Sequence, residues 1–532
     1  MYIASEDDRL WLQSVQRQLY ARSREHPDYV FAELWGFVTD PRNLRIAFAR
    51  VQRNRGARSA GIDRITVRKV VQQGVEPFLI AVRKDLRDGT FQPSPVRRVL
   101  IPKAGKPGAF RPLGIPTVED RVIQAAMKHI LEPIFEAGFY PVSYGFRPGK
   151  SVHGALASLK MRMRQRVANR WRGTARPSFQ WAIEGDIKGC FDHIDHHQLM
   201  ERVRRRIADG KLNRLIVAFL KAGVLSEAQF TRSDSGTPQG GILSPLLANV
   251  ALSIIEERYE RHVWPRAGKP KGRPGRPALP LTDPSAIARR AMMNRSNDQR
   301  TGGCIFVPVR YADDFIILMN SPIEESEQAR ALAEQEKSAL AEMLAAHMGL
   351  TLSPEKTLVT PVTTTMRFLG HHLRVRPHPT DGRLVAHVVI PKERSKRLRR
   401  TIALIFDRST ITETLEERLQ RLNPVLRGWG NFYRHAWGAK RVFASLDHYI
   451  WWTSCDSCAR STHTRVCGIW CGSTAGENPD SGRCVGRRAP RFPWHFRHCA
   501  WHLSACRPSA VRLTRKIRGR ARCVSKGARR VR

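Results

Sequence analysis

The sequence predicts an α+β protein, with mainly helical segments around hairpin-built sheets. Apolar residues recur at helical spacing in residues 5–40 and again in residues 324–347. Two pairs of short apolar runs, each joined by a polar tip, predict β-hairpins over residues 95–116 and 305–318. A length of 532 residues corresponds to about three to four domains, and a hydrophobic content of 42% is enough for ordinary cores.

The charge balance points to a polyanionic partner. The chain has 91 Lys and Arg against 47 Asp and Glu, a formal net charge of +44. Such a field attracts nucleic acid, and no apolar run approaches the roughly 18 residues of a membrane span. The acidic N-terminus lacks a signal-peptide core. We therefore expect a soluble, cytoplasmic, nucleic-acid-binding protein with no membrane partner. Only Cys190 and Cys304 precede residue 455, which is typical of a reducing compartment.

Helices dominate the first part of the chain. Pro27 is expected to interrupt the first helical region, and Pro133 to end or kink the helix before it. The expected helical segments are residues 5–40, 43–54, 66–73, 77–88 and 118–132.

The first predicted hairpin has a basic tip. Lys103, Lys106 and Arg111 could converge there on a phosphate chain, since arginine offers a bidentate fork and lysine a point charge. The alternative is a solvated basic hairpin.

Three further segments allow both a functional and a structural interpretation. The loop of residues 144–151 combines aromatic and basic residues. These residues either contact single-stranded nucleic acid, or the aromatic side chains anchor an ordinary loop to the core. A strand over residues 181–186 ends at Asp186, whose carboxylate is either a metal ligand or part of an ordinary turn. The glycine-rich loop of residues 236–245 opens an apolar helix, and it either brings backbone amides close to a substrate or makes a tight turn.

The second predicted hairpin carries Tyr311-Ala312-Asp313-Asp314 at its tip. Adjacent carboxylates repel each other unless a cation neutralises them, and aspartate oxygens suit Mg²⁺. The functional hypothesis is a two-metal phosphoryl-transfer site, and the alternative is ordinary turn chemistry. Pro308, three residues earlier, implies a bulge or an edge position.

Beyond the second hairpin the pattern returns to helices. A surface insertion is expected over residues 265–303, before the hairpin, and strands and turns over residues 349–373 after its helix. A basic helix over residues 392–407 precedes helices that Asn423-Pro424 and Gly428 are expected to break.

The order of these motifs resembles the reverse transcriptases, and most closely the group II intron-encoded reverse transcriptase/maturases, over roughly residues 35–452. The series is a basic hairpin, Asp186, the Pro238-Gln239-Gly240-Gly241 loop, Tyr311–Asp314, a Lys-bearing strand and Leu369-Gly370. The resemblance implies a right-hand polymerase with fingers, a palm that holds the antiparallel sheet and catalytic hairpin, and a helical thumb. The implied boundaries are 1–175 for the N-terminal extension and fingers, 176–392 for the palm with an insertion at 262–304, 393–452 for the thumb or maturase region, and 453–532 for a basic, Cys-rich tail.

The resemblance also implies roles for individual residues. Two Mg²⁺ ions would be held by the catalytic carboxylates of Asp186, Asp313 and Asp314 and by the backbone carbonyl of Ile187. The nucleotide would contact Lys103, Arg111, Ile187, Phe191 and Gln239. Primer and template would contact Lys356, Leu369 and Gly370. Intron RNA would contact Arg427, Trp429, Asn431 and Tyr433 on the thumb.

The function so implied is RNA-directed DNA synthesis by a bacterial, cytoplasmic protein that also binds its intron RNA as a maturase, promoting splicing and retromobility. Its partners would be intron RNA, an RNA template with a DNA primer, dNTPs and target DNA, and a homodimer is a further hypothesis. The alternatives are an RNA-binding splicing cofactor with a vestigial polymerase and a domesticated or defence-associated reverse transcriptase. The intact Asp186, Asp313, Asp314 and Gln239 favour the polymerase.

The tail changes in composition from about Thr453. Eight cysteines lie there, and no acidic residue follows Asp480. Cys455, Cys458, Cys467 and Cys471 allow a zinc hypothesis, and an arginine-based DNA-binding extension is a second one. The favoured hypothesis is a frameshift or truncation that replaced the native ending, and poor order is expected in each case.

Overall fold

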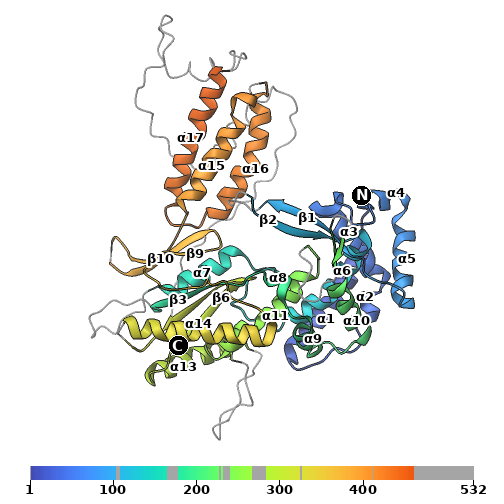
Figure 1. The fold of residues 1–532 in the computed structure, drawn as a ribbon, viewed down its shortest axis with the longest axis horizontal. Helices are drawn as coiled ribbons and strands as arrows, with labels where there is room; N and C mark the ends of the chain where they lie inside the picture. Colours follow the sequence, from blue (N-terminus) through green and yellow to red (C-terminus); the bar gives the residue numbers. More distant parts are fainter. Residues whose placement is uncertain are drawn as a thin grey trace, which may run out of the picture. The chain divides into compact units, whose positions relative to one another are not determined.

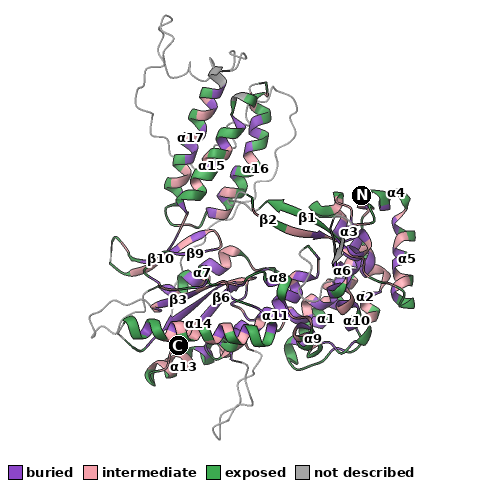
Figure 2. Cartoon of the chain, in the orientation of Figure 1, coloured by how far each residue is buried: buried purple, intermediate pink, exposed green. Residues whose placement is uncertain are grey.

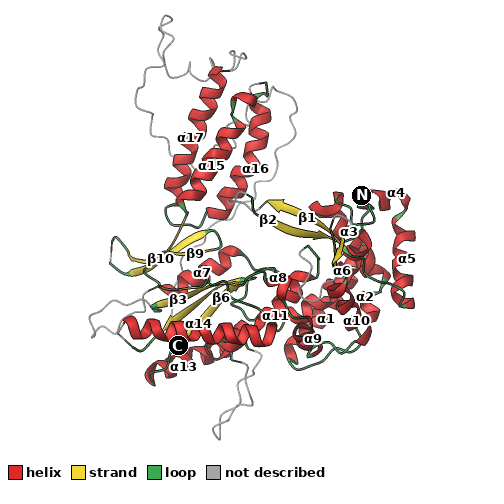
Figure 3. Cartoon of the chain, in the orientation of Figure 1, coloured by secondary structure: helices red, strands yellow, loops and turns green. Residues whose placement is uncertain are grey.

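The computed structural model describes residues 2–102, 108–164, 178–226, 229–231, 240–265, 283–323, 326–380, 382–410 and 412–460. The chain divides into two compact units (Figure 1). Unit 1 comprises residues 1–391 and 435–437, and unit 2 comprises residues 392–434 and 438–532. Helices and mainly antiparallel sheets occur together, so the predicted α+β class is confirmed (Figure 3).

The N-terminal part of unit 1 is helical. Its elements are α1 (Glu6–Glu25), α2 (Trp35–Val38), α3 (Pro41–Arg53), η1 (Arg55–Arg58), α4 (Val67–Gln73), α5 (Val75–Asp88) and α6 (Val118–Glu136). Helix α6 continues past Pro133, so of the two outcomes expected there, an end or a kink, the end is wrong. Proline leaves the carbonyl four residues earlier without its helical donor. That carbonyl, on His129, accepts a hydrogen bond from Gln16 Nε2 at 2.9 Å instead.

Unit 1 contains three sheets. The first has the strand order β2-β1-β4-β5, from β1 (Val96–Pro102), β2 (Phe110–Ile115), β4 (Val224–Ser226) and β5 (Gln229–Thr231). The second, the central sheet, has the order β6-β7-β3-β8, from β3 (Trp181–Asp186), β6 (Ile305–Tyr311), β7 (Asp314–Asn320) and β8 (Leu358–Pro361). The third has the order β11-β10-β9, from β9 (Met366–Phe368), β10 (His371–Pro377) and β11 (Leu384–Val389). Strand pairs β1–β2 and β6–β7 are antiparallel hairpins, as predicted.

The central sheet lies in the main hydrophobic core. Residues Phe315–Met319 of β7 are all buried, and Figure 2 shows buried strands of this sheet. Because successive side chains of a strand point to opposite faces, both faces of the sheet are covered at β7. Helix α14 (Ser326–Met348) packs along β3 and β8, and α7 (Val152–Met163) contacts β6 and β11. Strand β6 is at the edge of this sheet, which confirms the edge position expected for Pro308.

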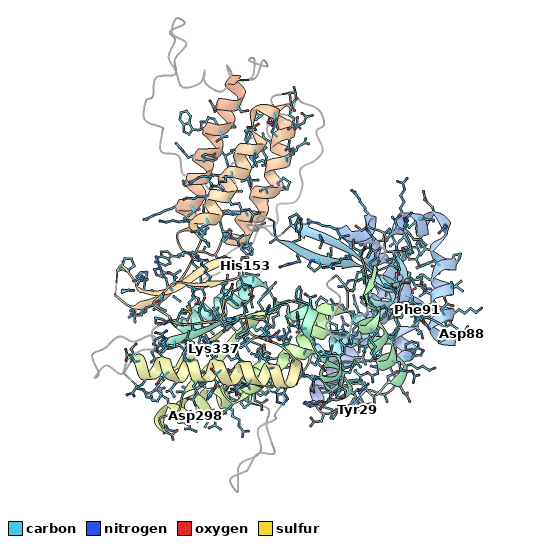
Figure 4. The ribbon with its side chains drawn as sticks, viewed as in Figure 1. Tyr29, Asp88, Phe91, His153, Asp298 and Lys337 are labelled. Carbon is cyan, nitrogen blue, oxygen red and sulfur yellow. The ribbon has the colours of Figure 1, made fainter. Side chains whose placement is uncertain are left out.

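Unit 1 has six further helices in its described part. They are α8 (Cys190–His193), α9 (His196–Arg204), α10 (Gly210–Lys221), α11 (Ser244–Arg258), α12 (Glu260–Val263) and α13 (Pro284–Arg300). Two of them, α12 and α13, contact β6. Helix α13 lies within the predicted surface insertion. Its Asp298, labelled in Figure 4, accepts hydrogen bonds from Arg261 Nη2 at 2.7 Å and His262 Nε2 at 2.8 Å and so ties the insertion to α12.

Unit 2 consists of α15 (Lys392–Ile405), η2 (Arg408–Thr410), α16 (Leu415–Tyr433) and α17 (Ala439–Arg460). The breaks expected at Asn423-Pro424 and Gly428 are wrong, because α16 is continuous through both. Pro424 and Gly428 are exposed, whereas Leu422 and Leu426 pack in the core of this unit. Burial of that apolar face outweighs local costs of about 3 kcal/mol for proline and about 1 kcal/mol for glycine.

Helix α17 continues to Arg460, past the boundary predicted at residue 452, and it contains Cys455 and Cys458. Cys467 and Cys471 lie outside the described residues, as does the tail beyond residue 460. Among the helices that the structure describes, none combines the length and the apolar character that a membrane crossing requires.

Candidate active site

Backbone pairing brings the three candidate aspartates together. Asp186 ends β3 directly opposite Asp314, which begins β7. Tyr311 pairs with Asp314 across the hairpin, so Ala312 and Asp313 form a two-residue turn. Ala312 has a φ of +58°, the left-handed conformation that such tight turns use. The sheet register therefore places a carboxylate from a distant strand beside the two at the hairpin tip.

Burial and neighbouring carboxylates raise the pKa of both Asp313 and Asp314. Burial, together with Asp313 and Asp186, raises the pKa of Asp314 to about 7. Burial also raises the pKa of Asp313, Asp186 adds to this effect, and Arg111 and Lys356 oppose it. The site thus concentrates negative charge that a cation would neutralise.

Lys356 contacts the catalytic candidates directly. Its Nζ lies 2.5 Å from Asp186 Oδ2, and this contact raises the pKa of Lys356. Residues before Lys356 pair with the end of β3, since Ser353 N donates to Asp186 O at 2.8 Å and Lys188 N donates to Thr351 O at 3.0 Å. The sequence predicted a primer or template contact for Lys356, and the structure places it among the carboxylates.

The predicted nucleotide residues are only partly described. Ile187 is buried and bridges to Leu352, next to Asp186. Phe191, half-buried on α8, packs edge-to-face on Phe146 with ring centroids 6.2 Å apart. Arg111 is exposed on β2, and its charge acts on Asp313. Lys103 and Gln239 lie outside the described residues.

The predicted primer residues form a tight turn between β9 and β10. Leu369 and Gly370 have φ values of +48° and +72°. Glu184, on β3, holds this region to the central sheet: its Oε2 accepts from Arg367 N at 2.9 Å, and its Oε1 accepts from Thr360 Oγ1 at 2.8 Å. Sequence reasoning missed Glu184. A charged residue inside an otherwise apolar strand was the available signal.

The predicted RNA-contacting residues lie on α16 of unit 2. Arg427 and Asn431 are exposed. The half-buried Trp429 ring lies 4.6 Å from the Tyr433 ring, and Tyr433 is buried. Of these four residues, only Arg427 and Asn431 are therefore exposed.

The chemistry of the donor set suits a divalent metal. In the described part of the chain no three carboxylate, thiol or imidazole groups already form a metal cage. A hard ion that shares its coordination with substrate phosphates needs only one or two protein carboxylates, and Asp186, Asp313 and Asp314 supply three. The residues fit a metal that binds together with a nucleotide.

Comparison with known proteins decides the family. The reverse transcriptase (RNA-dependent DNA polymerase) family matches residues 101–373, and the maturase-specific domain of group II introns matches residues 395–470. Protein YkfC of Escherichia coli (strain K12) is 31% identical over 396 residues, which cover 74% of this chain and 96% of YkfC. The chain belongs to the group II intron-encoded reverse transcriptases.

Two other relatives of this reverse transcriptase are longer proteins. The group II intron-encoded protein LtrA of Lactococcus lactis subsp. cremoris is 35% identical over 391 residues, 70% of this chain and 61% of LtrA. An uncharacterized 91 kDa protein in the cob intron of Schizosaccharomyces pombe is 28% identical over 473 residues, 81% of this chain and 54% of that protein. The chain thus spans about three fifths of LtrA, and the maturase match extends beyond residue 452.

Proposed function

We propose that this group II intron reverse transcriptase is an RNA-directed DNA polymerase that also binds its intron RNA as a maturase, promoting splicing and retromobility. The observation that carries the proposal is the convergence of Asp186, Asp313 and Asp314 at paired strand ends. The family match to both the polymerase and the maturase region supports it.

Asp186, Asp313 and Asp314, with the carbonyl of Ile187, would hold two Mg²⁺ ions. When bound, such ions supply the charge that activates the primer 3′-hydroxyl and stabilises the departing pyrophosphate. Phe191 would pack under the incoming sugar, and Lys103, Arg111 and Gln239 would bind the rest of the nucleotide. Leu369 and Gly370 would hold the primer end, and Lys356 would orient Asp186 before the nucleotide arrives. Positioning and charge stabilisation dominate this chemistry.

Unit 2 would bind intron RNA. Exposed basic residues gather on α15 and α16; they are Lys392, Arg394, Lys396, Arg397, Arg400 and Arg427. Trp451 and Trp452 are exposed on α17, 42% and 58% respectively. Exposed basic side chains and exposed aromatic rings in one unit suit both the phosphates and the unstacked bases of a folded RNA.

The remaining partners follow from the same proposal. They are an RNA template with a DNA primer, dNTPs and target DNA in a bacterial cytoplasm, and light scattering would test the homodimer hypothesis. For the tail, the gene's reading frame would test the frameshift hypothesis, and a zinc assay of the full chain would test the Cys455 and Cys458 hypothesis.

The polymerase proposal is tested by primer extension on an RNA template with the full chain. Asp313→Ala should abolish DNA synthesis and leave the affinity for intron RNA largely intact, because it removes a carboxylate and no basic residue. Asp88→Ala is the control, since Asp88 is an exposed aspartate on α5 (Figure 4).

Full synthesis by Asp313→Ala would contradict the carboxylate assignment. Binding of intron RNA without any synthesis by the unaltered chain would instead support a splicing cofactor with a vestigial polymerase. Synthesis without intron RNA binding, in a gene that no group II intron surrounds, would support a domesticated or defence-associated enzyme.

A further inference from the structure

Arg310, three residues before Asp313, is the largest fully buried side chain of the described residues, and its side chain has 0% exposure. Its guanidinium donates to four different residues. Nε donates to Glu256 Oε1 at 2.6 Å, and Nη2 donates to Glu256 Oε2 at 3.3 Å and Ser143 Oγ at 2.9 Å. Nη1 donates to Asn249 Oδ1 and to the carbonyl of Ala312, both at 3.0 Å.

The contact with the Ala312 carbonyl ties this guanidinium to the catalytic turn. Ala312 lies between Tyr311 and Asp313, and its φ of +58° is unfavourable for a residue with a Cβ. A strained turn needs surrounding contacts to keep its shape. Arg310 supplies one such contact from beneath the turn.

A second contact holds the other side of the turn. The backbone of Gly145 lies so close that a Cβ there would be 2.3 Å from Ala312 N. Gly145 O accepts from Asn249 Nδ2 at 2.8 Å, and Asn249 is also a partner of Arg310. The segment with Gly145 pairs with β6, since Tyr144 N donates to Arg310 O at 2.9 Å and Arg310 N donates to Val142 O at 3.0 Å. Arg310, Asn249, Gly145 and Ala312 thus form a closed ring of contacts.

We propose that Arg310 is a positioning residue that holds the Ala312-Asp313 turn in the shape needed for metal binding and catalysis, with Glu256 and Asn249 on α11 fixing its guanidinium. The role rests on the proposed polymerase function. The planar guanidinium of arginine has five N–H donors and can reach Glu256, Asn249, Ser143 and Ala312 together. The ammonium group of a lysine could not contact all four.

Stability alone does not account for this arrangement. Burying an arginine and a glutamate costs desolvation energy that their attraction only about repays, so apolar residues of similar volume often stabilise a fold equally well. Apolar residues could not supply the hydrogen bonds to Asn249, Ser143 and the Ala312 carbonyl, and the last of these reaches the catalytic turn itself.

Two variants separate positioning from stability. Arg310→Lys keeps a positive charge beside Glu256 but loses the fork. The double variant Arg310→Met with Glu256→Leu removes the buried pair without leaving an unpaired charge. The control is Arg202→Met with Glu257→Leu. Arg202 also pairs with α11, but it contacts Glu257, Ser253 and the carbonyl of Val250, none of them in the catalytic turn.

The measurements use the full-length chain. They are the melting temperature, Mn²⁺ binding followed by electron paramagnetic resonance, and kcat and KM for dNTP on a primed RNA. We expect both Arg310 variants to melt as cooperatively as the control and to bind Mn²⁺ about 10- to 100-fold more weakly, the usual effect of losing a residue that orients metal ligands. Their kcat should fall by a similar factor, with the affinity for template–primer unchanged.

Mn²⁺ affinity and kcat equal to those of the control in a folded Arg310 variant would overturn the proposal. Failure of both Arg310 variants to fold while the control folds would assign the pair a purely structural role and would overturn it as well. Absence of primer extension by the unaltered chain would count against the polymerase, whereas the Mn²⁺ comparison would still decide the role of Arg310.

Discussion

At the scale of single residues, the candidate site depends on backbone pairing. Asp186 and Asp314 face each other because β3 and β7 pair in one register, and a shift by one residue would turn one of them to the other face of the sheet. The sequence identified both as candidates, because each follows or precedes a recognisable apolar strand. Lys356 and Glu184 could not be placed beside their partners from sequence, since each contact joins segments that are far apart along the chain.

A buried aspartate in unit 2 leads to a pH prediction. Asp447 on α17 is 8% exposed, its Oδ2 has no hydrogen-bond partner among the described residues, and burial raises its pKa to about 6. The folded state therefore binds more protons than the unfolded state between pH of about 4 and about 6, so stability falls as pH rises through this range.

Asp447→Asn should remove this effect. Compared with the unaltered chain, we expect it to stabilise unit 2 by about 1–2 kcal/mol at pH 7.5 and by almost nothing at pH 4. Thermal melts at the two pH values measure the difference. Glu393→Gln, exposed on α15, is the control. A gain from Asp447→Asn that is equal at both pH values would show that the carboxylate is not the cause.

At the scale of elements, local pattern predicted the hairpins well and the helix ends less well. Both hairpins appear where two apolar runs flank a short polar tip, because the two strands and the turn are close in sequence. Helices α6 and α16 instead run through Pro133 and Pro424, because tertiary contacts satisfy or outweigh the local defect. Local residue propensity therefore predicts helix ends poorly wherever one face of the helix is buried.

Gly428 tests the continuity of α16. It is exposed in mid-helix, and a Cβ there would have nothing within 4 Å. Gly428→Ala should stabilise unit 2 by about 0.5–1 kcal/mol, since glycine loses more backbone entropy in a helix. Gly438→Ala is the control: space is equally free there, but its φ of +71° makes alanine unfavourable, so the change should destabilise. Urea unfolding measures both, and destabilisation by Gly428→Ala would contradict a continuous helix.

Gly185 tests the packing of the central sheet. It lies on β3 opposite Phe315, and a Cβ there would come within 2.0 Å of the Phe315 ring. Gly185→Ala should destabilise unit 1 by about 1–3 kcal/mol and reduce synthesis, because the ring must move and Asp314 is its neighbour. Gly36→Ala on α2, with nothing within 4 Å, is the control. Unfolding midpoints that match for the two variants would mean that the ring adapts without cost.

At the scale of the whole molecule, the net charge of +44 dominates. Composition alone predicted a nucleic-acid partner, because a long-range field depends on the number of charges more than on their exact placement. Which of those charges contact RNA depends on the fold, which decides the exposed faces.

Binding of intron RNA should weaken steeply with salt. Each phosphate contact contributes about 0.7–0.9 to the slope of log K against log salt concentration. A quintuple glutamine variant of unit 2 should lower that slope by several units; its positions are Lys392, Arg394, Lys396, Arg397 and Arg400. The charge-matched control replaces five exposed basic residues around α9 and α10, which are Arg204, Arg205, Lys211, Arg214 and Lys221. Filter binding over a KCl series measures the slopes, and equal slopes for the two variants would exclude α15 from the RNA interface.

The sequence by itself determined the α+β class, the two hairpins and the family resemblance, and its charge predicts a polyanionic partner. All of these depend on local periodicity, on motif order or on total charge, which need no knowledge of distant contacts. The tertiary structure decided the contact of Lys356 with Asp186, the hydrogen bond by which Glu184 braces the strand before the Leu369-Gly370 turn, and the burial of Arg310 with its hydrogen bond to Ala312. Each of these joins residues from different elements, and which elements meet depends on how the whole core packs.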